Sequence, residues 1–233
     1  MDYRQELKFL CSSAELKILE ARLSSLMERD KHLKGRQSYN IRSIYLDDYF
    51  DSFLEENEAG VNDRMKIRIR IYDTNDAVIH AEVKYKFNGM TRKESSPISR
   101  EICDGIMRGE PVPLQMIQAA PAVNLLAIGM HDRLLRPKVI VEYDREVFVS
   151  KTGNVRVTFD RNIRAGSRIE RFFEDDLYAV SVLEPGMHVL EVKYDEFLPE
   201  YIAQAIEIGT LRQTAFSKYY LSRKKMEEYG YVF

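Results

Sequence analysis

The chain has 233 residues, with 31% charged and 45% hydrophobic side chains and a formal net charge of -2 at pH 7. This length suits one sizeable domain, and we expect residues 1–233 to form one. A net charge near zero argues against the broad basic surface of most nucleic-acid-binding proteins, so we expect no nucleic-acid partner, and any anion site must be local.

Cysteine content and hydropathy indicate the compartment. Cys11 and Cys103 are too few for a disulfide framework and lack zinc-ligand spacing, so we expect buried free thiols in a reducing environment. No apolar run approaches the length of a membrane helix, and the first residues lack a signal-peptide pattern. A soluble cytoplasmic protein is the resulting expectation.

The first part of the chain predicts a strand, a helix and a second strand. Glu6-Leu7-Lys8-Phe9 alternates charged and apolar residues, which is strand periodicity. Ser12-Ser13-Ala14-Glu15 resembles a capping box, and leucines at positions 16, 19, 23 and 26 follow at helical spacing. We expect a short strand over residues 43–48 and an acidic, loop-like segment over residues 49–63.

The next segment, Arg64-Met65-Lys66-Ile67-Arg68-Ile69-Arg70-Ile71, has a cation at every second position and an apolar residue between. Alone, this pattern fits a strand whose basic face meets water. However, charged and apolar residues also alternate in residues 6–9, 82–85 and 190–194. Each of these three segments places an acid and a lysine on one strand face. Four such strands fit a closed barrel with a charged interior and helices packed outside. That interior suits a polyanion together with a hard divalent metal ion.

Asn88-Gly89 predicts a tight hairpin, because a type I′ turn needs positive φ at both central residues. The resulting register places Lys84 directly opposite Lys93. Like charges in such a pair are destabilising unless an anion lies between them. The register therefore hints at a bound phosphate chain.

The rest of the chain predicts helices, a second hairpin and a last strand. Residues 99–130 are mostly helical in pattern, and residues 139–149 and 155–163 form a hairpin around Thr152-Gly153. That register pairs Val149 with Arg156. Residues 190–194 give the last strand, residues 201–208 a helix, and the charged C-terminal segment a solvated helix face.

Taken in order, several of these segments resemble the VTC domain, the polyphosphate polymerase branch of the triphosphate tunnel metalloenzymes, a CYTH-like superfamily. The resemblance runs from about residue 3 to about residue 220. It is carried by Arg4-Gln5-Glu6-Leu7-Lys8-Phe9, Ser43-Ile44-Tyr45-Leu46-Asp47, residues 64–72, Glu82-Val83-Lys84, Tyr143-Asp144-Arg145, residues 155–160, Leu190-Glu191-Val192-Lys193-Tyr194 and Phe216-Ser217-Lys218.

The resemblance implies an α+β fold, an eight-stranded antiparallel β-barrel tunnel with helices packed outside. It implies an ATP-polyphosphate phosphotransferase that moves the γ-phosphoryl of ATP to a growing polyphosphate chain with Mn²⁺ or Mg²⁺. Catalytic positions would be Lys84, Arg68, Arg70 and Lys193. Substrate-binding positions would be Lys8, Lys66, Lys93, Tyr143, Arg145, Arg156, Ser217 and Lys218. Glu191 would be the leading metal ligand, with Glu6 and Glu82 as weaker candidates.

One departure distinguishes this chain from the hydrolase and cyclase branches of that superfamily, which begin with a Glu-x-Glu-x-Lys strand. Arg4 stands in place of the first Glu. Losing a carboxylate weakens a second metal site and favours a longer phosphate chain. Eukaryotic members also carry regulatory and membrane domains, so coupling to a membrane partner protein stays open.

Two other functions stay open at this point. One is a tripolyphosphate or nucleoside triphosphate hydrolase, with water as the acceptor in place of phosphate. The other is a non-catalytic polyphosphate-binding domain, which would need no metal. A P-loop enzyme is disfavoured, because no glycine lies in a phosphate-loop pattern.

Several candidate residues also have structural interpretations. Arg145 could form an ion pair with Asp160, which the second hairpin places opposite it. Tyr143 could be a core aromatic residue, and Glu82 and Glu191 could neutralise neighbouring lysines. Asp47 and Asp48 are expected to cap a turn. The four histidines lack metal-ligand spacing and are expected to have no chemical role.

Overall fold

The structure is a computed structural model that describes residues 4–113, 115, 120–209 and 211–231. It is an α+β fold in which a large antiparallel sheet is surrounded by six helices within the described residues. The long strands are β1 (Gln5–Ser12), β3 (Tyr39–Asp47), β4 (Arg64–Tyr72), β5 (Asn75–Phe87), β6 (Met90–Pro97), β7 (Arg136–Ser150), β8 (Val155–Gly166) and β10 (Met187–Tyr194). The helices are α1 (Ser13–Ser24), α2 (Ser52–Glu58), α3 (Arg100–Met107), α4 (Pro121–Asp132), α5 (Glu200–Ile206) and α6 (Lys218–Glu228).

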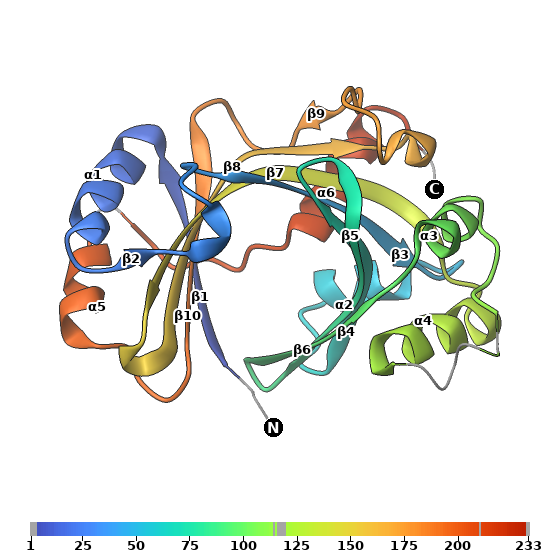
Figure 1. Cartoon of the computed structure of the whole chain (residues 1–233), viewed down its shortest axis with the longest axis horizontal. Helices are drawn as coiled ribbons and strands as arrows, with labels where there is room; N and C mark the ends of the chain where they lie inside the picture. Colours follow the sequence, from blue (N-terminus) through green and yellow to red (C-terminus); the bar gives the residue numbers. More distant parts are fainter. Residues whose placement is uncertain (1–3, 114, 116–119, 210, 232–233) are drawn as a thin grey trace.

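The long strands follow the order β1-β10-β8-β7-β3-β4-β5-β6, and every neighbouring pair is antiparallel. The short strands β2 (Glu28–Arg29) and β9 (Val180–Ser181) pair with β7 and β8. Figure 1 shows the sheet curving around a central space, with β1 and β6 as its two ends.

The two ends of the sheet meet at only one point in the described residues. Arg4 and Thr91 form one antiparallel bridge, with N···O distances of 3.2 and 3.3 Å, and β1 and β6 form no ladder beyond it. The closed eight-stranded barrel predicted from the sequence is therefore not confirmed. The observed sheet is strongly curved but open along most of the line between β1 and β6.

The outer face of the sheet is apolar and carries the hydrophobic core. Ile67, Ile69 and Ile71 of β4 are fully buried there, as the alternating pattern predicts. Helices α3 and α4 pack on the β5 to β7 side, while α1 and α5 cover the side formed by β1, β8 and β10 (Figure 1). Because helices take the apolar face, the charged face of the strands must point inward.

Local signals correctly predict several elements. The Asn88-Gly89 hairpin has the expected register, with Lys84 opposite Lys93 and Phe87 opposite Met90, and Val149 pairs with Arg156 in the second hairpin. Ser12 and Glu15 form the predicted capping box of α1. Leu26 lies beyond the end of α1 and is exposed, so the predicted apolar stripe ends at Leu23.

The acidic segment 49–63 differs from the predicted loop, because it contains α2. The Asp47 carboxylate accepts hydrogen bonds from the backbone N–H groups of Phe53 and Leu54 at 3.0 Å, and Asp48 accepts from Phe50 and Ser52. The capping role expected for both aspartates is confirmed. They cap a helix that the acidic composition of this segment does not predict.

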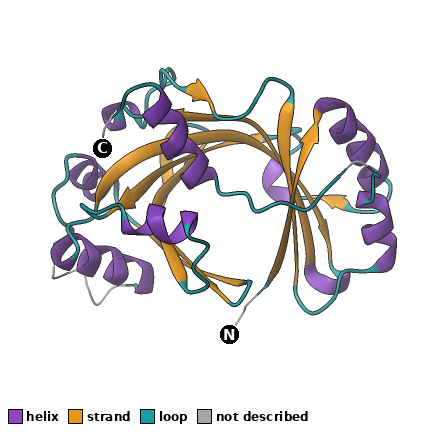
Figure 2. Ribbon diagram, turned by 180° about the vertical axis from the view of Figure 1, so that it is seen from behind, coloured by secondary structure: helices purple, strands orange, loops and turns teal. Residues whose placement is uncertain are grey.

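The C-terminal helix α6 also differs from the prediction of a solvated face. Arg223 is 1% exposed, and its guanidinium binds both oxygens of Asp51 at 2.7 and 2.9 Å. Tyr219 is buried beside it and donates a hydrogen bond of 2.5 Å to Asp47. Helix α6 is therefore fixed to α2 and the end of β3. Seen from behind, it lies across one opening of the curved sheet (Figure 2).

Candidate functional site

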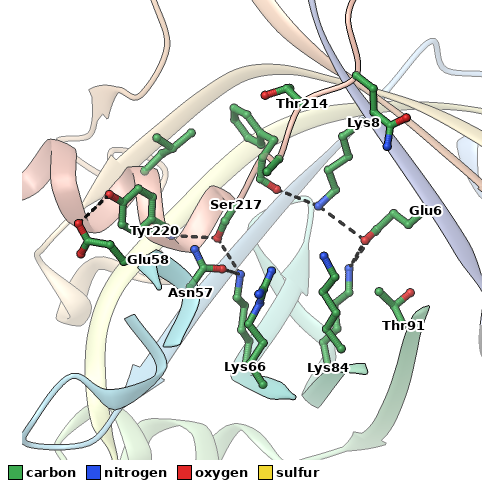
Figure 3. A pocket seen from close by; sticks show the side chains of 16 residues that line it. Glu6, Lys8, Asn57, Glu58, Lys66, Lys84, Thr91, Thr214, Ser217 and Tyr220 are labelled. Carbon is green, nitrogen blue, oxygen red and sulfur yellow. Dashed lines mark hydrogen bonds and ion pairs between the residues drawn. The ribbon is translucent and has the colours of Figure 1, made fainter. Parts of the chain in front are cut away.

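Two cavities lie on the inner face of the sheet. Cavity 1 has a volume of about 550 Å³ and reaches α2 and α6, and cavity 2 has a volume of about 480 Å³ and reaches Tyr39 and Tyr72. Both are lined by Lys8, Lys66, Lys84, Thr91 and Ser217, so they adjoin. Figure 3 shows part of cavity 1, with side chains of β1, β4, β5, α2 and α6 converging.

The cavities are strongly cationic. Fourteen lysine and arginine side chains line them, against three carboxylates. The cations are Arg4, Lys8, Arg64, Lys66, Arg68, Arg70, Lys84, Lys86, Arg92, Lys93, Arg145, Arg156, Lys193 and Lys218, and the carboxylates are Glu6, Glu58 and Glu191. Such an excess of enclosed positive charge favours a multiply charged anionic ligand.

Strand β4 runs from one cavity to the other. Arg64 lines cavity 1, Lys66 lines both, and Arg68, Arg70 and Tyr72 line cavity 2. Alternate residues of a strand project from one face roughly 6.7 Å apart. The strand therefore presents four cations in a row along the interior, followed by a tyrosine.

Neighbouring strands place more cations beside this row. Arg64 lies opposite Lys86, Lys66 opposite Lys84, and Lys84 opposite Lys93. The predicted pairing of Lys84 with Lys93 is thus present. Protein carboxylates supply part of the missing countercharge, because Lys84 binds Glu6 and Lys93 binds Glu82 at 2.9 Å. The lysine pair alone therefore does not require a bound phosphate.

Glu82 is the centre of one ion cluster. Its side chain is buried and binds Arg68 at 2.6 Å, Lys93 at 2.9 Å and, at a longer distance of 3.6 Å, Arg70. Burial alone would raise the pKa of Glu82, but these three cations outweigh it and lower the pKa far below its usual value. Glu82 lines neither cavity, so the structure places it behind the cations.

Glu6 and Glu191 form a second cluster with three lysines. Lys84 binds Glu6 at 2.8 Å, Lys193 binds Glu191 at 2.7 Å, and Lys8 lies 3.7 Å from each carboxylate. Burial would raise both pKa values, and the Glu191 charge would raise that of Glu6 further, but the lysines lower the pKa of Glu6 to about 2 and that of Glu191 well below its usual value. Both carboxylates are therefore ionised at neutral pH.

The same cluster changes the basicity of Lys84. Burial lowers its pKa to about 7, with further lowering from Lys8 and Lys193, and the Glu6 and Glu191 charges offset only part of this. Such a lysine is close to losing its charge at neutral pH. An anion beside it would restore the charge.

A third cluster joins β7, β8 and α6. Arg145 binds both oxygens of Asp160 at 2.6 and 2.7 Å, which confirms the ion pair expected from the hairpin register. Lys218 binds the same carboxylate at 2.6 Å and lies over the Tyr143 ring. Arg145, Lys218 and Tyr143 all line cavity 2. One carboxylate is therefore shared between two cations.

Tyr143 is buried, and its hydroxyl accepts a hydrogen bond of 3.0 Å from Arg70. Burial would raise the pKa of Tyr143, but the Arg145, Arg70 and Lys218 cations outweigh it and lower the pKa. Arg156 lines the same cavity and binds Asp30 at 2.5 Å.

Lys66 has a different environment, because it forms no ion pair with any residue that the structure describes. Its ammonium donates to Asn57 at 2.6 Å and to Ser217 at 2.7 Å, which links β4 to α2 and α6 (Figure 3). Burial, Lys8, Lys84 and Arg64 lower the pKa of Lys66 well below its usual value. Within the described ranges, Arg64 and Lys86 also lack a carboxylate partner.

Fourteen of the fifteen predicted site residues line the cavities, and Glu82 is the exception. Sequence reasoning missed Asn57, which lies in the segment predicted as a loop, and it did not assign Arg64, Lys86, Tyr39 or Tyr72 to the site. The alternating pattern already places Arg64 on the basic face of its strand. The alternation in β5 likewise places Lys86 on the same face as Lys84.

Few of the described side chains at the cavities could bind a metal ion. The described residues contain no group of three or more His, Cys, Asp or Glu side chains arranged to hold a metal. Glu6 and Glu191 are ionised oxygen donors facing the cavities, and Mg²⁺ in nucleotide sites is commonly held by one or two carboxylates together with substrate phosphates. These two residues fit a metal ion shared with a phosphate ligand.

Comparison with known proteins identifies the family. The VTC domain family model matches residues 3–227. The chain belongs to the VTC domain family. This result confirms the resemblance seen in the ordered sequence motifs. No curated protein matches the sequence.

Several solved structures resemble this VTC domain at low identity. They include a candidate adenylate cyclase from Bacillus halodurans (12% identity, TM-score 0.47, covering 88% of this chain and 86% of that one). Two Pyrococcus horikoshii proteins have TM-scores of 0.43, with 12% and 10% identity. They cover 88% and 87% of this chain and 84% and 85% of their own. Similarity at this level supports no conclusion about substrate or activity.

Cys11 and Cys103 are buried free thiols, as expected. Among the described residues, no helix combines the length and the apolar character needed to cross a bilayer.

Proposed function

We propose that this VTC domain is a polyphosphate polymerase. It would bind ATP and a polyphosphate chain on the inner face of the sheet and transfer the γ-phosphoryl of ATP to the chain end, releasing ADP. The family match and the curved sheet with a cationic interior support a triphosphate tunnel fold.

The main support is the unbalanced charge of the interior. Glu82 is shared among three cations and Asp160 between two, while Lys66, Arg64 and Lys86 have no carboxylate partner in the described chain. A phosphate chain carries negative charge along its whole length and could contact the β4 row from Arg64 to Arg70. A small monoanion could neutralise only one part of it.

The proposed mechanism is in-line transfer without a covalent enzyme intermediate. The phosphoryl group gains charge on its oxygens in the transition state, and fixed cations stabilise that charge. Arg68, Arg70, Lys84 and Lys193 would surround the transferring group, since they line cavity 2 from three strands. The acceptor is an anionic phosphate at neutral pH, so no strong general base is needed.

The other lining side chains would hold the rest of the substrate. Lys8, Lys66, Lys93, Arg145, Arg156 and Lys218 would pair with phosphate oxygens, and the Tyr143 and Ser217 hydroxyls would donate hydrogen bonds to them. Glu191 and Glu6 would hold Mn²⁺ or Mg²⁺. When bound, the ion would neutralise phosphate charge and fix the orientation of the chain.

The test is to incubate the purified protein with ATP and Mn²⁺ and resolve the products on a polyphosphate gel. Lys84→Ala removes a cation from both cavities, and Glu191→Gln removes the leading metal ligand. Lys17→Ala, on the exposed face of α1, is the matched control. We expect ADP and a lengthening phosphate ladder with the wild type and the control, and a loss of at least tenfold in the two cavity variants.

Other products would identify a different function. Orthophosphate without chain growth would indicate a hydrolase. Unchanged ATP together with Lys84-dependent polyphosphate binding would indicate a non-catalytic binding domain. Either result would reject the polymerase while retaining the cationic site.

A further inference from the structure

The two ends of the interior differ in chemistry. Arg64 is the first residue of β4 and Tyr72 is the last, so they lie roughly 26 Å apart along an extended strand. Arg64 lines only cavity 1, and Tyr72 lines only cavity 2. A substrate lying along β4 would therefore meet cations at one end and an aromatic ring at the other.

The Tyr72 end is suited to a flat, uncharged group. Tyr39 and Tyr72 have ring centroids 5.9 Å apart at an angle of 59°, and Ile41 lines the same cavity. Arg156 approaches the Tyr39 hydroxyl at 3.5 Å. Aromatic and apolar side chains beside a cation form a surface on which a nucleobase can stack next to its phosphates.

Tyr72 is also the accessible tyrosine of cavity 2. Of the five described tyrosines that line this cavity, Tyr39, Tyr45, Tyr143 and Tyr219 are buried, and Tyr72 is partly exposed. Tyr45 stacks on Tyr219 and accepts a hydrogen bond from Arg68, and Tyr143 accepts one from Arg70. Tyr72 therefore has ring surface left for a ligand.

The Arg64 end is suited to a chain of phosphates. Arg64 lies opposite Lys86, and neither has a carboxylate partner in the part of the chain that the structure describes. Burial and the like charges of Arg64 and Lys8 lower the pKa of Lys86, so an anion would relieve this repulsion. Cavity 1 also has two aromatic side chains, the buried Phe216 and the partly exposed Tyr220. Tyr220 is already engaged, because its hydroxyl donates to Glu58 and Lys224 lies over its ring.

We infer that the substrate has a fixed direction, with the nucleoside of the triphosphate at Tyr39 and Tyr72 and the phosphate chain extending toward Arg64 and Lys86. This inference rests on the proposed function, because it requires a nucleoside triphosphate as substrate. It assigns Tyr72 as the specificity-determining residue that distinguishes ATP from inorganic tripolyphosphate. It also assigns the opening beside α2 and α6 as the side from which the chain emerges.

The test compares two ligands that share their phosphates and differ in the nucleoside. Calorimetry would give the affinity of the wild type and Tyr72→Leu for ATP and for inorganic tripolyphosphate. Stacking on an aromatic ring is worth about 1–3 kcal/mol per base, so ATP should bind Tyr72→Leu about 5- to 150-fold more weakly. Tripolyphosphate affinity should stay within about twofold.

Two companion variants separate stacking from folding. Tyr72→Phe retains the ring and should retain ATP affinity. Tyr85→Leu changes a partly buried tyrosine of β5 that lines neither cavity, and it should leave both affinities unchanged. Arg64→Ala should weaken long-chain polyphosphate binding more than ATP binding and should reduce its salt dependence.

An equal loss of both ligands in Tyr72→Leu, or no loss of either, would overturn the inference. So would a selective loss of ATP in Arg64→Ala, because the direction would then be reversed. If the wild type binds neither ligand, the proposed function itself fails, which is a distinct result from failure of the direction alone.

Discussion

The Lys84 ammonium donates hydrogen bonds to both carboxylate oxygens of Glu6, at 2.8 and 2.9 Å, across 78 positions of sequence. This pair connects β5 to β1 across the open line of the sheet, near the Arg4–Thr91 bridge. Glu6 thus partly neutralises a cation of the proposed site. A phosphate ligand would share or replace that interaction.

We predict that binding of tripolyphosphate at pH 8 is accompanied by proton uptake. Lys84 has a pKa of about 7 in the free protein, so it is mostly neutral at pH 8, and an adjacent phosphate would raise that pKa and restore the charge. Calorimetry in buffers of different ionisation enthalpy should show uptake of about one proton, reduced in Lys84→Met. No buffer dependence in the wild type would contradict the prediction.

The lowered pKa of Lys84 also makes the unfolding free energy of the protein depend on pH. The pKa of Lys84 is lowered in the folded state relative to its value of 10.5 in model compounds, so between about pH 7 and 10.5 the unfolded chain binds the additional proton. Unfolding free energy from this group therefore rises with pH across that window. Urea titrations of the wild type and Lys84→Met at pH 7 and pH 9 should show a smaller rise in the variant.

We predict that Glu82→Gln destabilises the free protein by about 3–5 kcal/mol, because it leaves Arg68, Arg70 and Lys93 without their shared carboxylate. Polyphosphate should restore part of the lost melting temperature by supplying negative charge. Since the pKa of Glu82 is lowered, its stabilising effect is present at neutral pH and is lost only on strong acidification. A variant melting like the wild type, with or without ligand, would argue against this charge cluster.

Lys66→Met should have the opposite effect on the free protein. Lys66 is mostly enclosed and lacks an ion pair among the described residues, and the lowering of its pKa shows that its charge is disfavoured there. We expect the unfolding free energy to rise by about 1 kcal/mol, or about 2–4 °C in melting temperature, while polyphosphate affinity falls at least tenfold. A variant that is destabilised and still binds normally would show that Lys66 is structural.

Asp51→Asn should weaken the attachment of α6 to α2 and β7. Asp51 binds both Arg223 of α6 and Lys138 of β7, so its neutralisation removes the negative charge that these two buried cations share. We predict a loss of about 3 kcal/mol and faster hydrogen exchange in residues 218–228. Glu55→Gln, on the exposed side of α2, is the control. Equal exchange in the two variants would reject this anchoring role.

The parts of the fold that local chemistry determines could be predicted from the sequence. Asn88-Gly89 determines a turn, and the turn determines which residues of β5 and β6 face each other. The alternation in β4 determines which side chains share the inner face. Together, the turn and the alternation place Lys84 opposite Lys93 and Lys66 on the basic face of its own strand. That Lys66 lies opposite Lys84 is seen only in the structure.

The features that depend on distant packing could not be predicted. The charged segment around Arg223 predicts a surface position, whereas in the structure the side chain is buried and paired with Asp51, which lies 172 positions away. The α2 helix could not be predicted from its own residues, because its capping carboxylates come from Asp47 and Asp48, at the end of the preceding strand. Likewise, whether β1 and β6 form a ladder depends on the twist of the whole sheet, which no local motif encodes.

A crystal structure of the protein with Mn²⁺ and a non-hydrolysable ATP analogue would test the proposed phosphate site directly. We predict phosphate density along β4 in contact with Lys66, Arg68 and Lys84, a manganese anomalous peak beside Glu191, and the base against Tyr72. Phosphates bound outside the two cavities would contradict the proposed site. So would an interior still occupied only by its own ion pairs at saturating ligand.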